Sequence, residues 1–151
     1  MNAGEWQDKL TQWLELMPWL WFCSLTFRPV GLSKAQARLR LRRWAAALRD
    51  ELGTSDFGWF AVREFGRTGH DLHYHVLVKG LRAWHADERL EWMRRWWRIA
   101  GESQIAYYTP NTGGVAYILK NTDPSDADAI EIEIDASPLA RMRSATEVNP
   151  K

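Results

Sequence analysis

Two histidines in one apolar run are the first residues whose spacing suggests chemistry. His73 and His75 lie in DLHYHVLVKG, residues 71–80, a run long enough to form a buried strand. Because side chains alternate between the faces of a strand, both imidazoles are expected on one face. The preceding run, GWFAVREF, also alternates, and the glycines between the two runs predict a hairpin. Symmetric pairing about that loop places Glu64 opposite His73, on the face of the histidines.

These three residues form a mixed nitrogen and oxygen ligand set. A site with three protein ligands leaves positions open for water or substrate, which suits catalysis better than structural bracing. The single cysteine, Cys23, lies in an apolar strand and excludes an intrachain disulfide and a cysteine-based zinc cluster. Such ligands suit manganese, and magnesium is the abundant physiological candidate. On its own, a His-x-His strand is more often a pair of ordinary surface or core histidines.

A tyrosine and a lysine downstream strengthen the interpretation as an active site. Residues 112–121, TGGVAYILKN, predict the start of a helix with Tyr117 and Lys120 three apart on one face. A phenol has a pKa of about 10, so a nearby cation that favours the phenolate would make Tyr117 a better nucleophile. Tyr107 and Tyr108 are rival nucleophiles, but neither has a lysine three residues further on.

Taken together, three ordered motifs resemble those of the HUH endonuclease superfamily, the rolling-circle replication initiators of plasmids and small phages. WFCSLTF, residues 21–27, is similar to the family's first motif, an apolar strand that carries serine or threonine. HYH, residues 73–75, is similar to the metal-binding motif, and YILK, residues 117–120, to the motif of the nucleophilic tyrosine. Asn121 follows, where many members have an aromatic residue.

The resemblance implies metal-dependent, sequence-specific nicking and rejoining of single-stranded DNA through a 5′-phosphotyrosine intermediate. Tyr117 would be the nucleophile and Lys120 would assist it, while Glu64, His73 and His75 would hold Mn²⁺ or Mg²⁺. The implied setting is the start of rolling-circle replication of a plasmid or phage, in the cytoplasm of a bacterial or archaeal host. The expected partners are single-stranded DNA, as a replication origin or hairpin, and a host helicase or polymerase. We expect no membrane association, and a monomer or weak dimer.

Further residues are expected to contact the DNA. In the strand predicted over residues 19–28, the hydroxyl side chains share the face that we expect beside the metal. Basic side chains at the ends of the hairpin would also lie close to the metal and could bind phosphate. These expected contacts are Ser24, Thr26, Arg28, Arg63, Arg67 and Lys79.

Four helices are predicted around the strands. The first covers residues 3–17, and the second covers 34–52, with Ser33 as N-cap and Gly53 at its end. The arginines of the second helix are expected on a solvated face behind the sheet. The third helix covers 84–100, with Leu90, Met93, Trp97 and Ala100 at the spacing of a buried stripe and Trp92 and Trp96 widening it. The fourth is the tyrosine helix.

Charge divides the chain into two parts. Residues 1–122 carry 17 Lys and Arg against 12 Asp and Glu, whereas residues 123–151 carry 3 against 7. We assign the first part to one nuclease domain and the second to an acidic C-terminal segment. Within that segment AIEIEID, residues 129–135, predicts an edge strand with its isoleucines inward and its acids outward, followed by a flexible tail.

The order of these elements predicts an α+β domain. We expect a mainly antiparallel sheet of four or five strands with helices on one face, of the ferredoxin or RRM type, and the other face open to substrate. Two other functions remain open. One is a single-tyrosine transposase of the same superfamily, and the other is a non-catalytic module that binds single-stranded nucleic acid.

Overall fold

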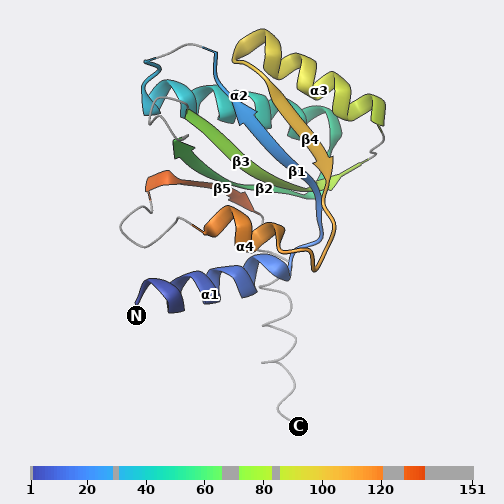
Figure 1. Cartoon of the computed structure of the whole chain (residues 1–151). Coiled ribbons are helices and arrows are strands. Elements are labelled where there is room, and N and C mark those ends of the chain that lie inside the picture. Colours follow the sequence, from blue (N-terminus) through green and yellow to red (C-terminus); the bar gives the residue numbers. More distant parts are fainter. Residues whose placement is uncertain (1, 29–30, 66–71, 83–85, 121–127, 135–151) are drawn as a thin grey trace.

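The computed structural model describes residues 2–28, 31–65, 72–82, 86–120 and 128–134. Within these ranges the chain forms four helices and five strands (Figure 1). In chain order they are α1 (Ala3–Glu15), β1 (Trp19–Thr26), α2 (Lys34–Leu52), β2 (Gly53–Phe65), β3 (Leu72–Leu81), α3 (Ala86–Ile99), β4 (Ser103–Tyr107), α4 (Gly114–Leu119) and β5 (Ile130–Ile134).

The strands form one antiparallel sheet with the order β4-β1-β3-β2-β5. The histidine strand β3 is therefore central, and the predicted α+β class with a mainly antiparallel sheet is confirmed. In the β2–β3 hairpin Glu64 pairs with His73 and Val62 pairs with His75. The predicted hairpin register is thus correct, because alternating apolar residues fix which side of each strand faces the core.

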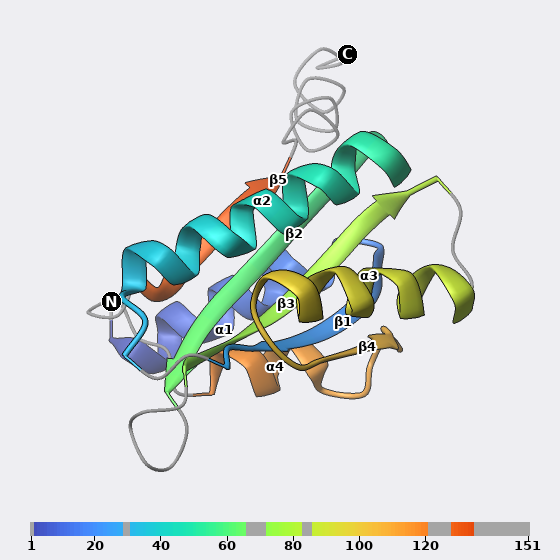
Figure 2. The same ribbon diagram turned by 90° about the horizontal axis from the view of Figure 1, so that it is seen from above.

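The two long helices cover one face of the sheet (Figure 2). α2 begins at a capping box in which the Ser33 side chain accepts from the Gln36 backbone and the Gln36 side chain accepts from the Ser33 backbone. Its residues Leu41, Trp44 and Leu48 enter a core shared with β1, β2, β3 and α3. Cys23 is buried in this core, and burial raises the pKa of its thiol far above the usual value, so the thiol is an inert small hydrophobe.

α3 presents a different side to the sheet from the one predicted. Trp92 and Trp96 are buried, whereas Leu90 and Trp97 are 55% and 48% exposed. Both sets of positions keep helical spacing, so spacing alone does not decide between them. Burying two large indoles against α2 and β1 removes more apolar surface from water than burying one indole and a leucine.

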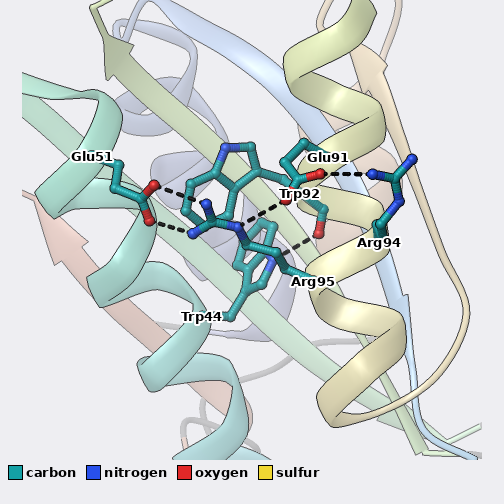
Figure 3. A network of polar contacts seen from close by, with 6 residues as sticks. All are labelled: Trp44, Glu51, Glu91, Trp92, Arg94 and Arg95. Carbon is teal, nitrogen blue, oxygen red and sulfur yellow. Dashed lines mark hydrogen bonds and ion pairs between the residues drawn. The ribbon is translucent and has the colours of Figure 1, made fainter.

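A network of polar contacts joins α2 to α3 on the outer side of this layer (Figure 3). Arg95 binds both carboxylate oxygens of Glu51, and its guanidinium lies 4.3 Å from the centre of the Trp92 ring. The indole nitrogen of Trp44 donates to the Trp92 carbonyl at 3.1 Å. These contacts fix the rotation of α3 about its axis, and with it the exposed position of Trp97.

α1 and α4 lie on the opposite face of the sheet, which departs from the prediction that the helices share one face. Leu14 of α1 and Ile118 of α4 pack with Phe60 and Leu77 of the sheet in a second core. α1 has an apolar stripe that a second sheet face can bury, and the short α4 can bury its own only where α1 supports it. The face that we expected to be open is therefore covered in part, and the histidines lie on it.

β5 is an edge strand, as predicted, but its acidic side chains do not point to solvent. Glu131 is buried and forms ion pairs with Arg38 and Arg42 of α2. Glu133 binds Arg49 at 2.6 Å and accepts from the indole nitrogen of Trp59 at 2.9 Å. The acids lie under the basic face of α2 because the strand packs beside that helix, so these arginines are not simply solvated. The isoleucines take the other face, where Ile132 is 41% exposed.

The domain boundary expected at residue 122, and the expected flexible tail, lie outside the described residues. None of the helices within the described ranges is long and apolar enough to cross a membrane.

Candidate metal and tyrosine site

The predicted ligand set converges on the sheet face that carries α1 and α4. One ligand atom from each of Glu64, His73 and His75 lies within 4.8 Å of the others. The Nε2 atoms of both histidines are 3.4 Å from the same carboxylate oxygen, Glu64 Oε2. The convergence follows from the hairpin, because paired residues on neighbouring strands project to the same side.

The orientation of His75 is set by a neighbour on β1. Ser24 pairs with His75 across the sheet, and its hydroxyl oxygen lies 3.4 Å from Nδ1 of the ring. That contact leaves Nε2 facing Glu64. Burial lowers the pKa of His75, and the Glu64 carboxylate opposes this effect. The neutral imidazole that burial favours is the form that ligates a metal.

The Glu64 carboxylate gives an independent indication that the site suits a cation. Its second oxygen, Oε1, is buried and has no hydrogen-bond partner among the residues that the structure describes. A buried carboxylate oxygen without a donor is costly unless something else binds it. Two imidazole nitrogens and a carboxylate are ligands that divalent transition metals accept, so these residues fit such an ion.

Tyr117 lies beside this cluster on α4. Val115, Ile118 and Leu119 are buried and anchor the helix, while Tyr117 stays 49% exposed. The centre of its ring is 5.6 Å from that of His75, in an edge-to-face arrangement. Gly113 caps the helix with a φ of 82°, a conformation that glycine adopts without strain.

Lys120 is the neighbour of Tyr117 that the helical spacing predicted. Its ammonium nitrogen lies 3.6 Å from the centre of the Tyr117 ring. The same lysine lowers the pKa of His75 through its charge, although less than burial does. The five residues predicted from three separate segments therefore lie in one neighbourhood.

The rival tyrosines are placed differently. Tyr107 pairs with Trp21, which directs its side chain to the α3 side of the sheet, where the Arg89 guanidinium lies 3.8 Å from the ring centre. Tyr108 contacts the core between the sheet and α4, and burial raises its pKa, with a smaller contribution from the charge of Glu15. A raised pKa disfavours the phenolate that a nucleophile requires.

The residues expected to contact DNA are divided by the structure. Ser24 lies within the site. The Thr26 hydroxyl donates to the Glu102 carbonyl at 2.7 Å, and Thr26 is exposed next to the histidine strand. The Arg28 side chain donates to the carbonyls of Trp97 and Ala100, so it braces the end of α3.

Arg63 and Lys79 are withdrawn from the expected DNA contacts. Arg63 projects to the α2 side of the sheet, is 6% exposed and binds Asp128 at 3.3 Å. Lys79 is 1% exposed and its ammonium donates to the backbone and side-chain oxygens of Asp56. A buried cation that already has a partner is not available to a phosphate. Arg67 lies outside the described residues.

Three residues near the site were not singled out from the sequence. The Phe22 ring lies 6.1 Å from that of His75, and Gln104 pairs with Ser24 on the far side of β1. Trp97 lines a cleft that reaches Ser24. Alternation along β1 would have placed Phe22 on the face of Ser24, but Gln104 and Trp97 needed the strand order and the rotation of α3.

Fold and site together define an α+β protein with a candidate metal and tyrosine centre on one face of an antiparallel sheet. A family model described as Replication-associated protein ORF2 matches residues 20–125, more than half of the chain. The chain therefore belongs to this family of replication-associated proteins. No curated protein and no solved structure matches it. The family supports a role in replication initiation and implies an interaction with nucleic acid.

Proposed function

We propose that this protein nicks and rejoins single-stranded DNA at a specific sequence, through a covalent 5′-phosphotyrosine intermediate, to initiate rolling-circle replication. The observation that carries the proposal is the position of the Tyr117 ring, 5.6 Å from the ring of His75 in a cluster of two histidines and a buried carboxylate. Membership of a replication-associated family is consistent with this chemistry.

In the proposed reaction the Tyr117 oxygen attacks the scissile phosphorus. A phosphorus–oxygen bond to the tyrosine forms, the bond to the 3′ oxygen breaks, and that oxygen takes up a proton to become a free hydroxyl. Attack by a 3′ hydroxyl on the phosphotyrosine reverses the step and rejoins DNA, because the bond energy is retained. The Lys120 ammonium, 3.6 Å from the ring centre, favours the phenolate over the phenol and lowers the negative charge near the phosphate.

Glu64, His73 and His75 would hold a divalent ion, Mn²⁺ or Mg²⁺. Such an ion, when bound, polarises a phosphate oxygen and stabilises negative charge on the leaving group. Ser24 keeps the His75 ring in the orientation that presents Nε2, and the buried strands around it exclude water from the ligand set.

The biological setting that we propose follows from this chemistry. A nick with a free 3′ hydroxyl supplies a primer end, so the partners would be an origin or hairpin in single-stranded form and a host helicase or polymerase. The DNA would belong to a plasmid or phage in the cytoplasm of its host. Tyr117 lies beside the histidines of its own chain, which favours a nicking enzyme over a transposase whose tyrosine helices are exchanged between two subunits.

Replacement of the nucleophile tests the proposal most directly. Incubation with a library of single-stranded oligonucleotides and Mn²⁺ should give a covalent adduct on the 5′ end of the cut strand. Tyr117→Phe should abolish the adduct, because the attacking oxygen is missing, and should leave non-covalent DNA affinity within about twofold. Mass spectrometry of the digested adduct reads the attachment site.

Matched controls are available on the neighbouring tyrosines. Tyr107→Phe and Tyr108→Phe remove the same atom from rings that the structure places elsewhere, so both variants should still form the adduct. A nucleotide on either of those residues would disprove the assignment of Tyr117. Absence of an adduct with every metal and sequence tried, despite DNA binding, would instead favour a binding-only protein.

A further inference from the structure

A cleft of about 390 Å³ opens next to the candidate metal site, where the end of α3 meets β1 and the start of β4. Its lining includes Ser24 and Thr26 of β1, Trp97 of α3, and Glu102 and Gln104 at the start of β4. Ser24 is shared by the two places, because its hydroxyl also contacts His75 at 3.4 Å. The cleft is therefore the immediate neighbour of the metal ligands that we propose.

Gln104 lies in the same row of the sheet as His75. It pairs with Ser24, and Ser24 pairs with His75 on its other side. Paired residues project to the same face, so the three side chains follow one another across β4, β1 and β3. Two strand spacings separate Gln104 from His75, about 10 Å in all.

Trp97 supplies an aromatic surface that is already held in position. Its indole is 48% exposed, and the Arg28 guanidinium lies 4.4 Å from the ring centre. Arg28 is itself fixed by the carbonyls of Trp97 and Ala100. The network between α2 and α3 in Figure 3 restrains the rotation of the helix that carries Trp97. An exposed tryptophan that is braced in this way loses little freedom when a flat ring stacks on it.

The chemistry of the lining suits a base better than a phosphate. Among the described residues that line the cleft none is basic, and Glu102 brings a carboxylate. A side-chain amide both donates and accepts hydrogen bonds, and a carboxylate only accepts. An aromatic face with an amide and a carboxylate therefore matches the stacking surface and the edge of an unpaired base that carries an amino group.

We propose that this cleft binds one nucleobase of the single strand close to the scissile phosphate and reads its identity. The proposal rests on the proposed nicking function for the position of the base, and it names the residues that select the sequence. Trp97 stacks on the base and Gln104 bonds to its edge. Bases with an amino group are preferred, and thymine is disfavoured.

The test is a binding selection that does not depend on cleavage. Tyr117→Phe protein would be used to select strands from a randomised single-stranded library, and the retained strands would be sequenced. In the same background, Gln104→Ala should lose about tenfold of the base preference at one position and leave the other positions unchanged. Trp97→Ala should weaken binding of the selected strand about 5- to 150-fold, and Trp97→Phe should restore most of it because a ring remains.

Control variants separate this effect from general damage. Leu90→Ala removes another exposed side chain of α3, and Gln12→Ala removes an exposed amide of α1, so neither should alter the preference. Circular dichroism and thermal unfolding would verify that each variant is folded. An unchanged preference at every position in Gln104→Ala and Trp97→Ala, or a preferred thymine at the affected position, would overturn the proposal.

The outcome is independent of the nicking assay. If the wild-type protein forms no adduct but the two variants lose the preference, the base-binding cleft stands and the nicking function falls. If adducts form normally and the preference does not change, the nicking function stands and the base-binding cleft falls.

Discussion

Ser24 shows how one side chain can define a candidate metal site without being a ligand. Its hydroxyl lies 3.4 Å from Nδ1 of His75, and Nε2 of the same ring lies 3.4 Å from Glu64. Groups that hold the second nitrogen of a ligating histidine fix the tautomer and the ring orientation. We therefore regard Ser24 as a positioning residue.

Ser24→Ala should weaken Mn²⁺ binding by about 10-fold, at the lower end of the range for such partners, because the ring loses one restraint but keeps its packing. Titration calorimetry would measure the affinity, and Ser24→Thr, which keeps a hydroxyl, should restore part of it. Ser55→Ala provides a control, because Ser55 is an exposed hydroxyl residue in the early part of β2, outside the ligand set. An unchanged affinity in Ser24→Ala would show that Ser24 has no positioning role.

At the level of elements, α4 depends on the glycine that precedes it. Gly113 has a φ of 82° and a Cβ added to it would meet no atom within 4 Å, so the conformation rather than crowding requires glycine. Gly31 in the loop before α2 has a φ of 81° and is equally uncrowded. The two positions have the same backbone strain but only one adjoins the tyrosine helix.

Gly113→Ala and Gly31→Ala should each lower the free energy of unfolding by about 1–2 kcal/mol, the cost of the left-handed conformation for alanine. Only Gly113→Ala should also slow nicking, by about 10- to 100-fold, because a small shift of α4 misplaces Tyr117. Denaturant unfolding and single-turnover cleavage measure the two effects. Equal nicking rates in the two variants would contradict a role for the α4 cap in positioning Tyr117.

β5 is held to the rest of the sheet partly by charge. Glu131 is 5% exposed and binds Arg38 and Arg42, whose side chains are 43% and 52% exposed. Glu131→Gln should lower the free energy of unfolding by about 1–2 kcal/mol, less than for a fully buried pair, because the arginines can return to water. Urea unfolding would measure the loss, and Asp50→Asn, at a carboxylate that is 71% exposed, should change stability by less than about 0.5 kcal/mol. Equal stability of Glu131→Gln and the wild type would contradict this role.

For the whole molecule, the candidate metal site lies between β2 and the central strand β3 and so couples ion binding to folding. A ligand that binds only the folded state at 100 times its Kd stabilises it by about 2.7 kcal/mol, which corresponds to a rise in Tm of about 5–10 °C for a chain of this size. Mn²⁺ should produce such a rise in the wild-type protein and EDTA should reverse it. His73→Ala and His75→Ala should abolish the rise without unfolding the apoprotein, while Glu64→Ala should keep part of it, because water can replace one ligand. A rise that persists in both histidine variants would place the metal elsewhere.

The amino-acid sequence by itself determined the elements and the register of the hairpin that carries the site. Alternation in β2 and β3, with a short loop between them, was enough to place Glu64 opposite His73. The capping residue Ser33 and the end of the second helix at Gly53 were also evident. These features depend on local periodicity and on backbone preferences, which act between residues close in sequence.

Tertiary structure alone decided what the remaining polar and aromatic side chains do. Arg63 and Lys79 have the composition of phosphate contacts, yet the face of Arg63 and the partner of Lys79 bury both. Glu131 points inward because α2 brings its arginines over β5, and Gln104 reaches Ser24 because β4 pairs with β1. Each of these outcomes depends on strand order and helix rotation. Those are set by packing the whole chain around two cores, and the spacing of residues along the sequence does not encode them.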